Sequence, residues 1–315
     1  MIGAQVGSLQ LRNPVMTASG TVGHSTELSR YVDLSKLGAV VVKSIASFAW
    51  EGNPPPRLAP TMGGMLNSVG LQGMGAEAWV RDEFPKLQRK NVTTVASIWG
   101  FGVRDYVDAA RMVAAAPIAA IEINLSCPNV SGHPPAGGST HQIFAHDENL
   151  VREIVRGVAE VGVPIWAKLS PNTDRLVTMA SAAAEEGASA VTLINTALGM
   201  AINPETGKPR LGNGGGGLSG PAIHPLAVRA VYEVHRSLPE LPIVGVGGVV
   251  GAEDALELMM AGASAVQVGT AHFAQPRTSV RLVDALEQWA NRNGVRTWSE
   301  IVGVAHRGGR NAPRG

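Results

Sequence analysis

Short apolar runs alternate with longer helical patterns along the whole chain. The runs lack strict alternation, which is typical of parallel strands that are buried on both faces. In the segments between them, apolar positions recur at a helical period, for example from Leu150 to Val161 and from Leu226 to Val234. Repeated βα units of this kind predict a (β/α)₈ barrel, the TIM barrel fold. We expect its eight strands at 15–20, 39–44, 93–100, 119–127, 164–170, 190–196, 242–248 and 265–270.

The predicted units form one domain, because no shift in composition marks a boundary. We expect a single barrel domain over residues 1–305 and a disordered tail over the basic, glycine-rich residues 306–315. Gly38, Gly187 and Gly262 each precede a predicted strand. They are predicted to end the preceding helix in the left-handed conformation.

Two connections are too long to be simple turns. The first covers about 48–75 and the second about 198–220. Long loops inside a compact domain are usually lids or binding loops. They predict active-site insertions after the second and sixth strands.

Composition and charge exclude several classes of protein. Of the 315 residues, 26 are Lys or Arg and 25 are Asp or Glu, so the net charge of +1 predicts neither nucleic-acid nor membrane-surface binding. The single cysteine, Cys127, excludes an internal disulfide and a four-cysteine metal site. His141 and His146 lack a clear third ligand, so no metal site is predicted. With no membrane-length apolar run and no signal-peptide pattern at the start, we expect a cytoplasmic protein.

Polar or flexible residues end almost every predicted strand, where barrels of this fold build their active sites. Glycines after the last two strands predict a phosphate site, although they could also serve only as tight turns. The strand-end residues are Ser19, Gly20, Lys43, Ser44, Ser97, Asn124, Cys127, Lys168, Asn195, Thr196, Gly247, Gly248, Gly269 and Thr270.

Three of these residues carry reactive groups. Lys43 or Lys168 could pair with Glu122, balance charge on a phosphorylated cofactor ring, or form a Schiff base. Cys127, in NLSCPN, could be a small buried apolar residue, a nucleophile or a general base. The spacing alone leaves these alternatives open.

The motifs VVVKSI, LNSVGLQG, INLSCPN, AKLSPN, LINT and GVGGV resemble those of the class 1 dihydroorotate dehydrogenases, in order and over nearly the whole chain. The resemblance implies an FMN-dependent barrel of pyrimidine biosynthesis that oxidises dihydroorotate to orotate. By this resemblance Cys127 is the base that removes the C5 proton, and Lys43 lies near both flavin and substrate. The implied substrate-binding residues are Lys43, Asn67, Ser68, Val69, Gly70, Leu71, Asn124, Asn129, Asn195 and Thr196. The implied cofactor-binding residues are Ser19, Gly20, Lys43, Ser44, Ser97, Asn124, Lys168, Ile194, Gly220, Gly247, Gly248, Gly269 and Thr270.

Two departures from the family pattern are visible. Ser97 stands where relatives often have asparagine, which weakens the prediction of a flavin contact there. The segment 132–144, after the fourth strand, is longer and more proline-rich than usual. We expect it to be a third insertion and the lid.

The stretch 198–223 resembles class 1B, which reduces NAD⁺ through a partner subunit that carries FAD and a [2Fe–2S] cluster. This resemblance implies a homodimeric core and a heterotetramer with that subunit, whereas class 1A would be a homodimer that uses fumarate. Two other functions stay open from the residues. One is a flavin barrel acting on another dihydropyrimidine, and the other is a flavin-free lyase or phosphate-binding barrel.

Overall fold

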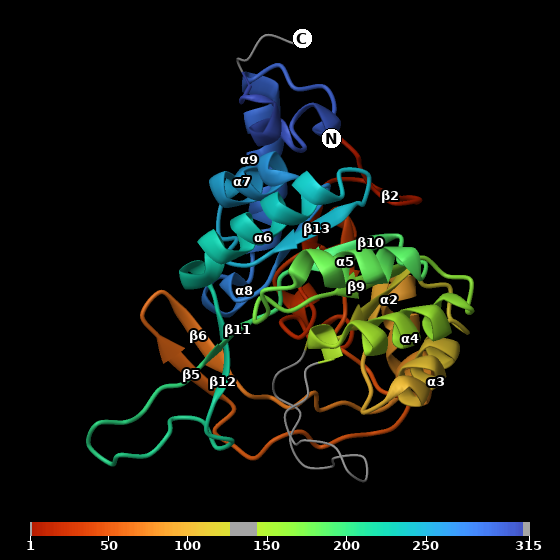
Figure 1. Cartoon of the computed structure of the whole chain (residues 1–315), viewed down its shortest axis with the longest axis vertical. Coiled ribbons are helices and arrows are strands. Elements are labelled where there is room, and N and C mark those ends of the chain that lie inside the picture. The colour runs from red at the N-terminus through yellow and green to blue at the C-terminus, as the bar shows by residue number, and fades with distance from the viewer. Residues whose placement is uncertain (1, 127–143, 311–315) are drawn as a thin grey trace.

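Eight parallel strands close into a barrel, in which the last strand pairs with the first (Figure 1). The computed structural model describes residues 2–126 and 144–310. Each barrel strand falls inside one of the eight predicted runs, so the predicted fold is confirmed. The strands stop before the runs do, so most of the polar strand-end residues lie in the loops above them, whereas Ser97, Asn124 and Lys168 lie in the last two residues of their strands. The strands are β3 (Val15–Thr17), β4 (Ala39–Val41), β7 (Thr94–Ile98), β8 (Ala120–Asn124), β9 (Ile165–Lys168), β10 (Ala190–Leu193), β13 (Ile243–Val246) and β14 (Ala265–Val268).

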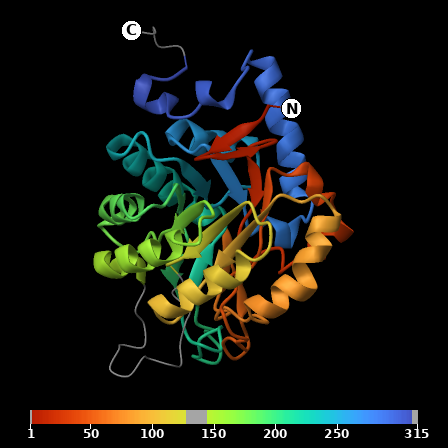
Figure 2. The ribbon, with the colours of Figure 1, turned by 90° about the vertical axis from the view of Figure 1, so that its right-hand side faces the viewer.

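Helices surround the barrel and bury their apolar faces against it (Figure 2). In α4 (Glu148–Ala159), the predicted stripe is buried at Val151, Ile154, Val155 and Val158. This helix begins where the Asp147 side chain accepts hydrogen bonds from two backbone N–H groups. The other α-helices are α1 (Ala76–Ala78), α2 (Phe84–Arg89), α3 (Val103–Val113), α5 (Leu176–Glu185), α6 (His224–Ser237), α7 (Ala252–Ala261), α8 (Ala271–Ala274) and α9 (Thr278–Arg292). The 3₁₀ helices are η1 (Glu27–Arg30), η2 (Leu34–Lys36), η4 (Phe144–His146), η5 (Pro221–Ile223), η6 (Trp298–Glu300) and η7 (Val304–Arg307), and a π-helical segment, η3 (Trp79–Glu83), lies between α1 and α2.

The three glycines predicted to end helices behave differently. Gly187 (φ 103°) and Gly262 (φ 133°) have positive φ after α5 and α7, as predicted. The prediction for Gly38 is wrong, because it follows the short turn η2 and has no positive φ. A Cβ atom at this position would lie 2.3 Å from the backbone oxygen of Asn13, so close backbone approach requires the glycine.

A second, antiparallel sheet of four strands is built from the two long connections (Figure 1). Its order is β11 (Ala197–Gly199), β12 (Gly216–Ser219), β6 (Gly64–Asn67), β5 (Leu58–Thr61). The connections were predicted as loops, so this sheet was missed. β6 follows β4 and β11 follows β10, which places the sheet at the C-terminal end of the barrel. The segment 127–143, after β8, lies outside the described residues, and with it most of the insertion predicted there.

The two chain ends pack on the same side of the molecule (Figure 1). A hairpin of β1 (Ala4–Val6) and β2 (Leu9–Leu11) begins the chain, and Trp298 Nε1 donates to the backbone oxygen of Ile2. In the predicted tail, the ring of His306 stacks on Tyr232 with centroids 3.9 Å apart. The structure describes residues 306–310 of the predicted tail, and residues 311–315 lie outside the described residues. Among the described residues, no helix has the length and apolar character needed to cross a membrane.

Candidate active site

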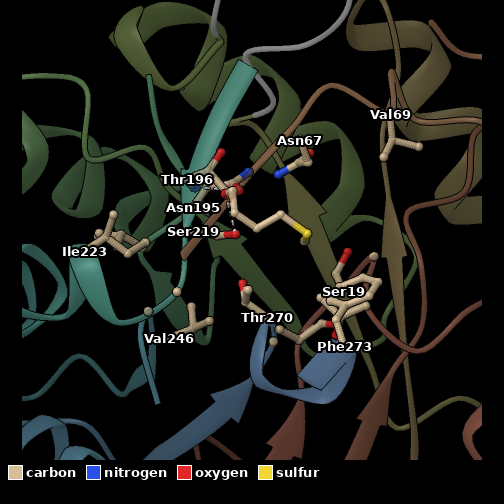
Figure 3. A pocket seen from close by; sticks show the side chains of 18 of the residues that line it. Ser19, Asn67, Val69, Asn195, Thr196, Ser219, Ile223, Val246, Thr270 and Phe273 are labelled. Carbon is tan, nitrogen blue, oxygen red and sulfur yellow. Dashed lines mark hydrogen bonds between the residues drawn. The ribbon is translucent and has the colours of Figure 1, made fainter. Parts of the chain in front are cut away.

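A cavity of about 310 Å³ opens at the C-terminal end of the barrel (Figure 3). Its volume is at the lower end of the range usual for cofactor and substrate sites. The strand-end loops supply its floor and walls, and the second sheet adds Met65 of β6 and Ser219 of β12. Further lining residues that the sequence did not suggest include Val246, Val250 and Phe273.

Most of the predicted site residues that the structure describes lie around this one cavity. Two do not line it: Ser68, which accepts a hydrogen bond from Asn53 Nδ2 at 2.9 Å, and Ser97. Cys127 and Asn129 lie outside the described residues. Those that line the cavity are Ser19, Gly20, Lys43, Ser44, Asn67, Val69, Gly70, Leu71, Asn124, Lys168, Ile194, Asn195, Thr196, Gly220, Gly247, Gly248, Gly269 and Thr270.

Ser97 supports the cavity floor from below. Its hydroxyl lies 2.9 Å from that of Ser44 and 3.2 Å from that of Ser19. Ser44 also accepts a hydrogen bond from Asn124 Nδ2 at 3.0 Å. The three serines and the asparagine come from four different loops or strands. The network therefore fixes the rotamers of the lining residues relative to one another.

Asn195 joins the floor to the loop after β8. Its Nδ2 donates to Ser126 Oγ at 2.8 Å and to Asn124 Oδ1 at 3.3 Å, while its Oδ1 accepts from the backbone N–H of Thr196 at 2.8 Å. Ser126 is fully buried and was not predicted as a site residue. Its position two residues after Asn124, at the end of a strand, was the available signal.

The two lysines differ in their surroundings. Lys168 is buried, and its Nζ lies 3.5 Å from Oε1 of Glu122, one of the alternatives that the sequence left open. Lys43 is half-buried, and its Nζ donates to the backbone oxygen of Gln72. The pKa of His24 beside Lys43 is lowered, first by burial and second by that lysine, so His24 adds no positive charge at neutral pH.

The loop Asn67–Leu71 is held by hydrogen bonds from residues that do not line the cavity. Trp50 Nε1 donates to the backbone oxygen of Gly70 at 3.0 Å, and the backbones of Trp50 and Gly73 exchange two hydrogen bonds. The N–H of Asn53 donates to the Val69 oxygen at 3.0 Å. Gly70 (φ 72°) and Leu71 (φ 58°) have positive φ, so the loop takes a conformation that is held by these contacts.

In the turns after β13 and β14, glycine residues bring backbone atoms to the cavity wall. Gly248 has φ 72°, and a Cβ atom there would lie 2.5 Å from Cβ of His224. Gly247 and Gly248 after β13, with Gly269 and Thr270 after β14, occupy the position at which barrels of this fold bind phosphate. The cavity thus combines a phosphate-type turn with a buried cation and apolar walls, which fits a phosphorylated ring cofactor. Among the described residues, no group of three or more His, Cys, Asp or Glu side chains could hold a metal.

These features define a TIM barrel with a deep strand-end site of the kind found in barrel oxidoreductases that bind a phosphorylated ring cofactor. The family model described as dihydroorotate dehydrogenase matches residues 1–289. The chain belongs to this family. It is 45% identical over 303 residues to a protein of Alkaliphilus oremlandii, which covers 96% of this chain and 98% of that protein. It is 47% identical over 306 residues to a protein of Desulforudis audaxviator, which covers 96% and 97%. Both relatives are named dihydroorotate dehydrogenase B (NAD(+)), catalytic subunit.

Proposed function

We propose that this chain is the catalytic subunit of a class 1B dihydroorotate dehydrogenase, which oxidises (S)-dihydroorotate to orotate. The observation that carries the proposal is the gathering of Asn67, Asn124 and Asn195 with Lys43 around one cavity. Asparagine amides supply both donors and acceptors, as a planar ring with alternating N–H and C=O groups requires. The lysine supplies a positive charge for the substrate carboxylate.

The cofactor in this proposal is FMN. When bound, FMN would accept the hydride that leaves C6 of the substrate, while a base takes the C5 proton. Lys168 is buried and lines the cavity, so it would stabilise negative charge on the reduced ring, and the turns at Gly247–Gly248 and Gly269–Thr270 would hold the phosphate. The side chain of Ile194 and that of Val246 contribute apolar wall to the same cavity.

Cys127 is assigned by resemblance as the base that removes the C5 proton. Ser126, the residue before it in the chain, accepts a hydrogen bond from Asn195, which lines the cavity. In the proposed reaction the Cys127 thiolate would act on the face of the substrate opposite to the cofactor, because the base and the hydride acceptor then do not compete for one face. Asn129, two positions later in the sequence, is proposed as a substrate contact.

The proposal includes a partner. The relatives are named catalytic subunits of an enzyme that uses NAD⁺, which implies a further subunit in those proteins. We propose that electrons leave this chain through a subunit with FAD and a [2Fe–2S] cluster, in a heterotetramer around a homodimer of this chain. Cys127 is the single cysteine here, so the cluster has to be held by another chain. A cytoplasmic location, predicted from the sequence, is part of the same proposal.

The test is a visible spectrum of the purified chain, followed by anaerobic addition of dihydroorotate. We expect a flavin band that bleaches on addition, which would identify cofactor, substrate and hydride direction together. A flavin band that does not bleach would refute the substrate. A colourless protein that fails to bind added FMN would refute the flavin function and favour the flavin-free barrel.

Specificity is tested by thermal stabilisation with orotate and with uracil, which lacks the carboxylate. A ligand that binds the folded state raises the unfolding temperature according to its affinity. We expect orotate to stabilise the protein more than uracil does. Equal stabilisation would favour a different dihydropyrimidine as substrate.

A further inference from the structure

A carboxylate is buried inside the barrel. Glu122, on β8, has 0% of its surface exposed. Its Oε2 accepts hydrogen bonds from Thr192 Oγ1 of β10 at 3.1 Å and from Gln267 Nε2 of β14 at 2.8 Å. The interior of a TIM barrel is normally filled with branched apolar side chains, and burying an ionised group is costly without a partner. A charge at this depth therefore needs a structural or chemical reason.

The second oxygen of this carboxylate faces Lys168. Oε1 lies 3.5 Å from Lys168 Nζ, and within the described part of the chain it has no hydrogen-bond partner. The groups around Glu122 are thus a hydroxyl and an amide N–H at Oε2 and an ammonium facing Oε1. With no other charged group at Oε1 among the described residues, Glu122 and Lys168 form a buried ion pair.

Lys168 also lines the cavity, so one ammonium faces both the buried carboxylate and the proposed cofactor. Its strand neighbours in register, Asn124 on β8 and Thr192 on β10, are uncharged. Across the cavity, Lys43 is the other charged lining residue among those described. Glu122 is therefore the negative charge placed to balance Lys168.

We infer that Glu122 is a positioning residue, the counter-ion that holds Lys168 charged and fixed at the floor of the cavity. This inference rests on the proposed function, because the lysine acts on the FMN that the cavity is proposed to bind. Lys168 would stabilise negative charge on the flavin ring, and Glu122 would act only by holding Lys168 in place.

The consequence concerns proton uptake. In Glu122→Gln, Lys168 becomes a buried cation without a counter-ion, and such a group is stabilised by releasing its proton. Reduction of the bound FMN then places negative charge beside Lys168, and the lysine takes the proton back. The variant should bind one proton more per two electrons than the wild-type protein does.

The experiment measures the midpoint potential of bound FMN from about pH 7.5 to about pH 9, above the ordinary titration range of carboxylates and histidines. One proton per two electrons changes the potential by about 30 mV per pH unit, and two protons change it by about 60 mV. We expect the lower slope for wild type and the higher slope for Glu122→Gln. A one-proton slope in Glu122→Gln would overturn the inference.

Thr192→Val is the matched control. It removes one hydrogen bond to the same carboxylate oxygen but leaves both charges in place. We expect it to keep the one-proton slope. A two-proton slope in this control as well would mean that any disturbance of the barrel interior changes proton uptake, and it would overturn the assignment to Glu122.

A stability comparison covers the case in which Glu122→Gln does not fold. Lys168→Met should be destabilised, because it leaves the carboxylate buried and unpaired, whereas Lys168→Met with Glu122→Gln removes both charges. We expect a folded-to-unfolded ratio at least about tenfold higher for the double variant. A double variant no more stable than the single one would overturn the pairing. Wild-type protein that binds no FMN would refute the proposed function instead, and this comparison would still test the pair.

Discussion

Replacing Trp50 by phenylalanine should make the loop Asn67–Leu71, which the family resemblance assigns to substrate binding, less ordered without disturbing the barrel. The change deletes the hydrogen bond from Nε1 to the Gly70 oxygen (3.0 Å) but keeps an aromatic ring against Phe101, whose centroid lies 5.1 Å away. The two backbone hydrogen bonds between residues 50 and 73 also remain. A neutral hydrogen bond of this kind contributes about 1 kcal/mol, so the loop conformation that binds substrate should be about fivefold less favoured.

The assay is steady-state oxidation of dihydroorotate, with Trp298→Phe as control. That variant also loses an indole hydrogen bond, from Nε1 to the Ile2 oxygen at 3.1 Å, where the two chain ends pack. Both variants should unfold at slightly lower denaturant concentration, but only Trp50→Phe should raise KM, by up to about fivefold. The reasoning is refuted if Trp50→Phe leaves KM unchanged, or if the control raises KM equally.

Three further predictions follow from single positions. Cys127→Ala should retain FMN but slow anaerobic flavin reduction by about 10² to 10⁴, and unchanged reduction kinetics would contradict the base assignment. Gly248→Ala should be destabilised by about 1–3 kcal/mol and bind FMN weakly, measured by flavin fluorescence, because φ is 72° and the new Cβ atom would clash with His224; normal FMN binding would remove Gly248 from the phosphate turn. Burial lowers the pKa of His272 from 6.5 to about 4, so the unfolded state binds more protons than the folded state between these pH values. The stability that depends on the neutral imidazole is therefore fully present above pH 6.5 and is lost as the pH falls towards 4. From pH 7 to pH 5, the free energy of unfolding measured in urea should fall by about 2 kcal/mol less in His272→Phe than in wild type. Equal falls in the two proteins would contradict the assignment of this pH dependence to His272.

The barrel was predictable because its signals are local. Each strand is buried on both faces and therefore appears as an apolar run, and glycines such as Gly187 and Gly262 mark helix ends by their backbone conformation. Gly38 shows the limit of this reasoning. Glycine is required there because the backbone of Asn13, which is distant in sequence, leaves no room for a side chain, and not because a helix ends there.

The second sheet was not predicted because its pairing is not local. Asn67 of β6 lies opposite Gly217 of β12, 150 residues along the chain, and β11 spans three residues. No periodic pattern can develop in a strand of that length. A local signal did exist at the β5–β6 hairpin, where Met62 and Gly63 form a two-residue turn between short strands.

Within the site, position at a strand end predicted which residues line the cavity better than it predicted their partners. Ser97 lies at a strand end, but its hydroxyl contacts Ser44 and Ser19 underneath the lining. The pairing of Glu122 with Lys168 was one of several alternatives in the sequence. Only the register of β8 against β9 places these two side chains together.

The joining of the two insertions into one sheet restricts how this enzyme can be redesigned. β6 pairs with β5 from its own insertion and with β12 from the other, so neither insertion completes the sheet by itself. A loop graft that exchanges only the first insertion would leave β12 with an unpaired edge, which is prone to aggregation. The two segments form one exchangeable unit, and chimaeras between homologues should transfer 48–75 and 197–220 together.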